Sequence, residues 1–134
     1  MAFDDQLQLV NEKADFTAKS ENPMSVTLDL SALYKNKVES AIRTVTLEGG
    51  KVVVRDVIKT GAEPVELRWH LLTDATAKVT DEQTITLTKD NEGLTISNIG
   101  NAPVKARTWS TKSPNSYDAD NGSTIFVGFE GTLP

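Results

Sequence analysis

The feature that most constrains the fold of this chain is a regular alternation of apolar and polar residues. It is clearest over residues 65–71, VELRWHL, where every second residue is apolar and the residues between are polar or charged. Successive side chains of a β-strand point to opposite faces of its sheet, so this spacing predicts a strand with one apolar face. We expect Val65, Leu67, Trp69 and Leu71 on that face, and Glu66, Arg68 and His70 on the other.

Shorter runs with the same alternation recur along the chain, and residues that favour turns separate them. Gly49-Gly50 predicts a tight hairpin, and residues 89–93 predict a longer hairpin loop in which Gly93 is available for a positive φ. Many short strands with frequent turns indicate a sandwich or a barrel. We expect an all-β fold, an antiparallel β-sandwich of short strands that forms a single domain over residues 1–134. The further runs are Leu7 and Leu9; Val26, Leu28 and Leu30; Val45 and Leu47; Ile85 and Leu87; Leu94 and Ile96; and Ile125, Val127 and Phe129.

Two segments depart from this pattern. Val52, Val53 and Val54 are consecutive and therefore apolar on both faces, which is typical of a central strand covered on both sides or of one that passes between sheets. Residues 31–42 mix helical and strand spacing. There we expect no more than one helical turn, near residues 31–34, followed by a strand from about Val38.

Composition and charge exclude several classes of protein. The 134 residues include 14 basic and 19 acidic side chains, and the net charge of −5 argues against nucleic acids and anionic membranes as partners. The absence of cysteine excludes disulfides and thiol chemistry, and the single histidine excludes a His-rich metal site. No apolar run approaches the roughly 20 residues of a membrane helix. Residues 1–9 lack the apolar stretch of a signal peptide. We expect no metal and no cofactor.

Few residues suggest catalysis. His70 titrates near neutral pH and could act as a general base, but its place among polar strand positions favours a structural or solvated histidine. No Gly-x-Ser-x-Gly elbow occurs, and the spacing of the many carboxylates is uninformative. Residues 118–122, DADNG, hint at calcium, but they lack the distal acidic residue of an EF-hand loop, so an ordinary turn is the better interpretation. We predict no catalytic residue in this chain.

Arg107, Trp109, Lys112 and Tyr117 form the most suggestive group for binding. Aromatic rings near a loop can stack on sugar rings, and basic side chains can pair with uronate or sulfate groups. These four residues are therefore our candidates for carbohydrate binding. The competing interpretation, which we favour from the sequence, is that Trp109 belongs to the core at the end of a strand.

An ordered set of segments resembles the C-terminal β-sandwich of the heparinase II/III-like polysaccharide lyases. Residues 29–34, DLSALY, match the D-L-S-x-x-Y segment of that family, and Arg43 lies on the next predicted strand. Residues 52–56 then read VVVRD, and Trp69 follows on the strand after that. The resemblance covers roughly residues 15–73 well and the rest of the chain more loosely.

The resemblance implies a parent enzyme with an α/α-toroid domain upstream of a β-sandwich, exported to the periplasm or the cell exterior. Such enzymes cleave uronic-acid-containing glycans, such as heparin, heparan sulfate or alginate, by β-elimination. A tyrosine or histidine removes the C5 proton while polar groups stabilise the enolate-like charge. The main catalytic residues of the family lie upstream, so the resemblance implies that this chain is a C-terminal fragment without activity of its own. Tyr34, Arg43, Asp56 and Trp69 match the family as architecture.

Two other functions stay open from the sequence. One is a stand-alone carbohydrate-binding module that holds an acidic polysaccharide through Trp109, Tyr117 and the nearby basic residues. The other is an adhesion or interaction domain with an unrelated Ig-like sandwich, because sandwiches serve many functions.

Overall fold

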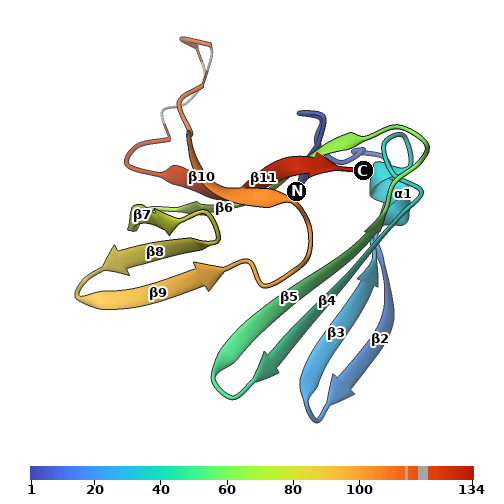
Figure 1. Ribbon diagram of the computed structural model, residues 1–134, viewed down its shortest axis with the longest axis horizontal. Helices are drawn as coiled ribbons and strands as arrows, with labels where there is room; N and C mark the ends of the chain where they lie inside the picture. The colour runs from blue at the N-terminus through green and yellow to red at the C-terminus, as the bar shows by residue number, and fades with distance from the viewer. Residues whose placement is uncertain (114, 118–120) are drawn as a thin grey trace. The chain divides into compact units, whose positions relative to one another are not determined.

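The computed structural model describes residues 1–113, 115–117 and 121–134 of the chain. Strands dominate this part, and the all-β prediction is confirmed, with three antiparallel sheets of short strands in a sandwich-like architecture. The strands are β1 Ala2–Phe3, β2 Asp15–Glu21, β3 Met24–Asp29, β4 Ser40–Glu48, β5 Lys51–Lys59, β6 Val65–Thr73, β7 Thr76–Asp81, β8 Thr84–Lys89, β9 Glu92–Ser97, β10 Val104–Ser110 and β11 Ile125–Leu133, and the helical turn α1 is Ser31–Tyr34 (Figure 1).

The described chain divides into two compact units. The first, which we call the N-terminal unit, consists of Phe3–Val65 with Pro134 and carries the sheet of order β2-β3-β4-β5. The second, the C-terminal unit, consists of Met1–Ala2 with Glu66–Leu133 and carries the sheet of order β7-β8-β9. It also contains nearly all of the sheet of order β1-β6-β11-β10. That the whole chain is one sandwich domain stays a prediction.

The hairpin between β4 and β5 has the turn that the sequence predicts. Glu48 pairs with Lys51, and Gly49 and Gly50 between them have φ values of 56° and 74°. Glycine adopts such angles without steric cost, and two residues with positive φ give a turn whose twist matches that of the flanking strands.

Two predictions about strands in the N-terminal unit are wrong. β5 is an edge strand of its sheet, and its valines Val52, Val53 and Val54 are 67%, 40% and 38% exposed, so this strand is not covered on both sides. β-Branched residues fit the pleated backbone of any strand. An unbroken run of them therefore indicates a strand but does not indicate that the strand is buried. Leu7 and Leu9 belong to no strand, and Leu7 is 73% exposed.

The helical turn α1 and the start of β4 form the buried part of the N-terminal unit. α1 spans four residues, as expected from the sequence, and β4 begins at Ser40. The ring of Tyr34 meets that of Phe3 edge-on, with 5.0 Å between their centroids. The apolar side chains buried in this unit are Phe3, Leu30, Leu33, Tyr34, Val38, Ala41 and Val65.

In the described residues no helix is long and apolar enough to cross a membrane.

The C-terminal unit has its own buried group, drawn from one face of each of its sheets. The strand alternation predicted over residues 65–71 holds at its start, where Val65 and Leu67 are buried and Glu66 is exposed. The turn between β7 and β8 is tied to β10, because Glu82 accepts a backbone hydrogen bond from Ala106 at 2.7 Å. The buried apolar side chains of this unit are Ala2, Leu67, Ile85, Leu87, Val104, Ala106, Val127, Phe129 and Leu133.

The β8–β9 hairpin differs from its prediction. Lys89 pairs with Glu92, so the loop contains only Asp90 and Asn91, whose φ values are 50° and 66°. Gly93 lies inside β9 instead of providing the positive φ. Aspartate and asparagine tolerate the left-handed region better than other side chains, and these two residues therefore supply a tight turn without glycine.

Two glycines of β11 are required by close contacts with neighbouring backbone. A Cβ atom on Gly128 would lie 1.9 Å from the carbonyl oxygen of Trp69, and one on Gly131 would lie 2.1 Å from that of Pro103. No heavy atom fits at such distances, so any side chain at either position would force the strands apart.

Candidate functional site

Trp109 lies near the end of β10, on the face of its sheet that points away from the buried side chains. Val104 and Ala106 alternate with it and are 4% and 2% exposed, whereas Trp109 is half-buried. The alternation puts Arg107, which is exposed, on the same face as Trp109. Trp109 is therefore not a member of the buried group. We call the surface formed by Arg68, His70, Arg107, Trp109, Phe126 and Glu130 the Trp109 face.

Arg68 of β6 holds the indole of Trp109 in place. Its guanidinium carbon lies 5.1 Å from the centre of the Trp109 ring, within the range of a cation–π interaction. Its Nε and Nη2 atoms both donate to Oε1 of Glu130, at 3.0 Å and 2.9 Å. The guanidinium is thus fixed between a carboxylate and a ring, and part of the indole surface is already covered by it.

His70 lies at the aromatic part of the same face. Its ring is edge-on to that of Phe126, with 5.0 Å between centroids, and to that of Trp109, with 6.4 Å. Burial lowers the pKa of His70, the positive charges of the N-terminus and Arg68 lower it further, and the backbone of Arg68 partly offsets this. Within the described residues Nδ1 is buried without a hydrogen-bond partner of good geometry. His70 is thus a member of an aromatic cluster, and among the described residues no carboxylate is bonded to its ring.

The other two candidate residues lie in the loop that follows β10. Lys112 is exposed two residues after the strand ends, and Tyr117 is 84% exposed farther along the loop. The base of the loop is closed by Thr111, which donates its hydroxyl to the Thr124 carbonyl at 2.8 Å, and by Asn121, which donates to the Thr111 carbonyl at 2.6 Å. The structure brings Arg107 and Trp109 together, and among the described residues it shows no ring contact between Tyr117 and the Trp109 face.

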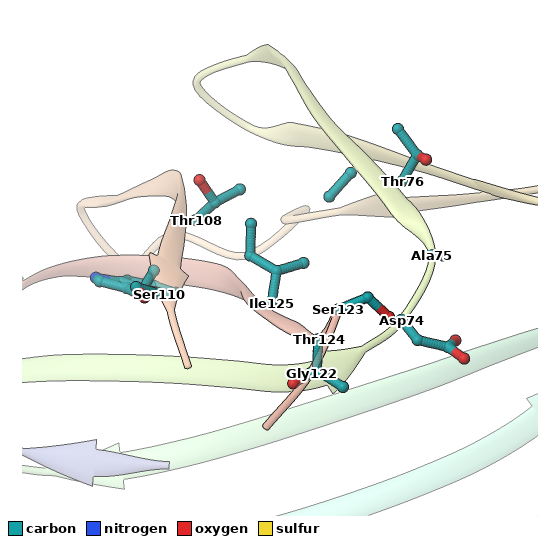
Figure 2. Close-up of a pocket in the computed structure, with 11 residues that line it drawn as sticks. Asp74, Ala75, Thr76, Thr108, Ser110, Gly122, Ser123, Thr124 and Ile125 are labelled. Carbon is teal, nitrogen blue, oxygen red and sulfur yellow. The ribbon is translucent and has the colours of Figure 1, made fainter. Parts of the chain in front are cut away.

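A shallow depression of about 630 Å³ lies beside the ends of β10 and β11, and residues 74–77, 108–110 and 122–125 line it. Figure 2 shows Thr76, Thr108 and Ile125 around one open space, while the carboxylate of Asp74 points away from them. Asp74 pairs with Lys89 at 2.6 Å, and this hydrogen bond lowers the pKa of Asp74. The lining offers hydroxyl groups for hydrogen bonds but no histidine that could activate one of them.

The described residues contain no group of three or more histidine, aspartate or glutamate side chains that could hold a metal ion. The predicted turn at residues 118–122, with its hint of calcium, lies largely outside the described residues, because Asp118, Ala119 and Asp120 are not among them.

The sequence did not identify Arg68, Phe126 and Glu130 as neighbours of Trp109. Arg68 and Glu130 are 62 residues apart, and only the pairing of strands brings them together. The one available signal was the alternation on β6, which puts Arg68 and His70 on the face opposite Leu67.

The comparisons with known proteins do not extend these observations to a family. The chain matches no protein-family model and no curated protein.

Proposed function

We propose that this chain is a non-catalytic β-sandwich domain of a heparinase II/III-like polysaccharide lyase, whose other domains carry out β-elimination of uronic-acid-containing glycans. The proposal is carried by the way the residues of the resemblance interlock at one corner of the N-terminal unit. The Asp29 carboxylate accepts a hydrogen bond from the Ser31 N–H at 2.9 Å, and the Ser31 hydroxyl accepts one from the Ala41 N–H at 3.1 Å. The D-L-S segment thus fixes α1 against β4.

The tyrosine of the same motif is part of this corner. Tyr34 is 6% exposed and packs edge-on against Phe3. Burial raises the pKa of Tyr34, although the charge of Arg43 acts in the opposite direction. A tyrosine that abstracts the C5 proton must reach the sugar and carry negative charge, and burial opposes both. These observations support an architectural role for the matching residues.

The remaining candidate base supports the same interpretation. His70 lies among the rings of Trp109 and Phe126, and within the described residues no carboxylate holds it in the orientation that a general base needs. We therefore assign the proton transfers of β-elimination to an upstream α/α-toroid domain of the same parent chain. In this proposal the parent is exported to the periplasm or the cell exterior, where its acidic polysaccharide occurs.

The first test is the reading frame upstream of residue 1 in the gene. The proposal requires this reading frame to encode a helical domain of several hundred residues, because an α/α-toroid is a large helical domain. A complete gene without such a domain would refute the lyase proposal.

The second test separates architecture from catalysis in the parent enzyme. We expect the chain alone to form no unsaturated uronate from heparin or alginate, measured by ultraviolet absorbance. In the parent, Tyr34→Phe and His70→Gln should leave kcat within about twofold, because loss of a general base lowers rates by about a hundredfold or more. A fall of that size in a folded variant would assign catalysis to this domain instead.

A further inference from the structure

The cations on and near the Trp109 face differ in whether an acidic residue neutralises them. Lys105 pairs with Glu82 at 2.6 Å, and Arg68 pairs with Glu130. Arg107 is exposed on β10, two residues after Lys105, and forms no ion pair with a described acidic residue. Lys112, at the end of β10, is also exposed and likewise has no ion pair within the described residues. Along the chain, an unneutralised cation thus lies on either side of Trp109: Arg107 precedes it on β10, and Lys112 follows it at the start of the loop.

The backbone sets the spacing of these groups. Arg107 and Trp109 are two positions apart on one strand, which separates their Cα atoms by about 7 Å. On the neighbouring strand Arg107 is paired with Gly128, which has no side chain to cover it. The Arg107 guanidinium and the exposed part of the Trp109 ring can thus contact one extended ligand at the same time.

We propose that the Trp109 face binds a sugar polymer that carries carboxylate or sulfate groups. Trp109 contacts the apolar side of a sugar ring, Arg107 forms a forked ion pair with an acidic group of the adjoining unit, and Lys112 attracts a further acidic group. Arg68 does not bind the ligand. Held by Glu130, it positions the indole so that the ring is already ordered before the sugar arrives.

Single-stranded nucleic acid also combines negative charge with stacking, but this face suits it poorly. Such ligands are bound by long basic grooves with several stacking rings. Among the described residues of this face and the adjoining loop, Arg107 and Lys112 are the two unneutralised cations beside one half-covered indole in sequence, and the chain has a net charge of −5. One ring contact and one or two ion pairs are instead suited to a sugar ring and its acidic groups. The choice of an acidic sugar as ligand rests on the proposed function, whereas the location of the binding site is inferred from the positions of Arg107 and Trp109 alone.

The experiment is a titration of the chain, followed by calorimetry and by tryptophan fluorescence. The probes are an alginate oligosaccharide, a heparin oligosaccharide of the same length, a neutral mannan oligosaccharide and a single-stranded oligonucleotide. We expect saturable binding of at least one acidic oligosaccharide, weakened by added salt because ion pairs contribute. The two acidic probes distinguish carboxylate from sulfate recognition. Binding of the neutral probe with equal affinity, or of the oligonucleotide alone, would overturn the proposal.

Matched variants locate the site. Arg107→Ala should weaken binding by about tenfold, the loss expected for one charge-assisted contact. Lys105→Ala, on the same face but already paired with Glu82, should change affinity by less than about twofold. Equal effects of these two variants would contradict the assignment. Both positions are exposed on β10, so both variants should fold, which circular dichroism checks.

The two tryptophans provide a second, independent readout. Trp69 packs against Phe129, with 6.3 Å between ring centroids, on the opposite face of its sheet. In Trp69→Phe the remaining emission comes from Trp109 and should still respond to the acidic sugar, whereas in Trp109→Phe the response should disappear. A response that survives in Trp109→Phe would place the sugar elsewhere. If the chain binds the acidic sugar but its complete gene encodes no helical toroid domain, the binding proposal stands and only the proposed function is refuted.

Discussion

Arg43 of β4 and Asp56 of β5 face each other across the sheet and form a two-pronged ion pair. Nε of Arg43 donates to Oδ1 of Asp56 and Nη2 donates to Oδ2, each at 2.7 Å. The two residues are direct partners in the strand register, and their side chains are 25% and 14% exposed. The hydrogen bond to Asp56 is the main reason that the pKa of Arg43 is raised. This pair fixes the register of two strands at a position where both charges are largely removed from water.

Replacing one partner should therefore cost stability. We expect Asp56→Asn to lower the free energy of unfolding by about 2 kcal/mol, because it leaves a largely buried guanidinium without its counter-ion. Urea unfolding followed by circular dichroism measures the change. The control is Arg55→Gln, one residue away and exposed on the other face, which should change stability by less than about 0.5 kcal/mol. Similar losses in the two variants would show that the ion pair contributes nothing specific.

Gly128 should tolerate no side chain. Gly128→Ala would put a methyl group 1.9 Å from the Trp69 carbonyl oxygen, and the strands must separate to admit it. We expect a loss of about 3 kcal/mol or a failure to fold. Gly61→Ala is the matched control, since no atom lies within 4 Å of its added Cβ, and it should be neutral or slightly stabilising. Expression, thermal melting and urea unfolding of the two variants decide between these outcomes.

The core of the C-terminal unit predicts a contrast between two apolar residues on neighbouring strands. Ile85 of β8 is fully buried, whereas Leu94 of β9 is 58% exposed. Ile85→Ala removes buried methyl groups and leaves a cavity, so we expect it to cost about 3 kcal/mol. Leu94→Ala should cost less than about 1 kcal/mol, because much of that side chain already contacts water. Equal destabilisation would mean that Leu94 is buried in solution.

The pH dependence of stability should include a contribution from His70. Its pKa is lowered from 6.5 in the folded chain, mainly by burial. Below that ordinary value the unfolded chain binds a proton that the folded chain does not, so the free energy of unfolding falls as the pH decreases. Urea midpoints at about pH 7.5 and 5.5 should therefore differ more for the native chain than for His70→Gln. A native chain whose midpoint rises toward acid pH would contradict this.

Carboxylates contribute to stability in a lower pH range. Hydrogen bonds to the side chain and N–H of Ser31 lower the pKa of Asp29 from 3.8. Stability from this group is present above that ordinary value and is lost only as the pH falls through the lower, folded pKa. The two groups can therefore be distinguished by the pH at which stability is lost.

Apolar patterns in the sequence predicted strands whether or not the strand is buried, since Leu94 and Ile96 indicated β9 although most of its residues are exposed. β6 and β8 alternate between buried and more exposed residues, and their patterns were recognised. β2 is exposed along its whole length and has no apolar alternation, since backbone hydrogen bonds to β3 define it instead of burial. Leu7 and Leu9 show the reverse case, an alternating pair that forms no strand.

The Trp109 face was predictable only in part, for a related reason. The sequence grouped Arg107 and Trp109 as basic and aromatic residues near a loop, and strand alternation in β10 puts both on one face. Arg68 and Glu130 reach the same indole through strand pairing, which composition and local spacing do not encode. Local sequence patterns therefore identified Arg107 and Trp109 but not the distant residues, Arg68 and Glu130, that complete this surface.

The two constrained glycines of β11 also provide a fingerprint for distant relatives. Gly128 and Gly131 are required by contacts with backbone atoms, so the requirement does not depend on which side chains surround them. Proteins that share this strand arrangement could exchange nearly every core residue and still retain glycine at these two positions, three residues apart in the last strand. Two glycines three residues apart in one predicted strand, with a tryptophan in the strand before it, therefore form a pattern that can identify relatives whose overall sequence similarity is too low to detect.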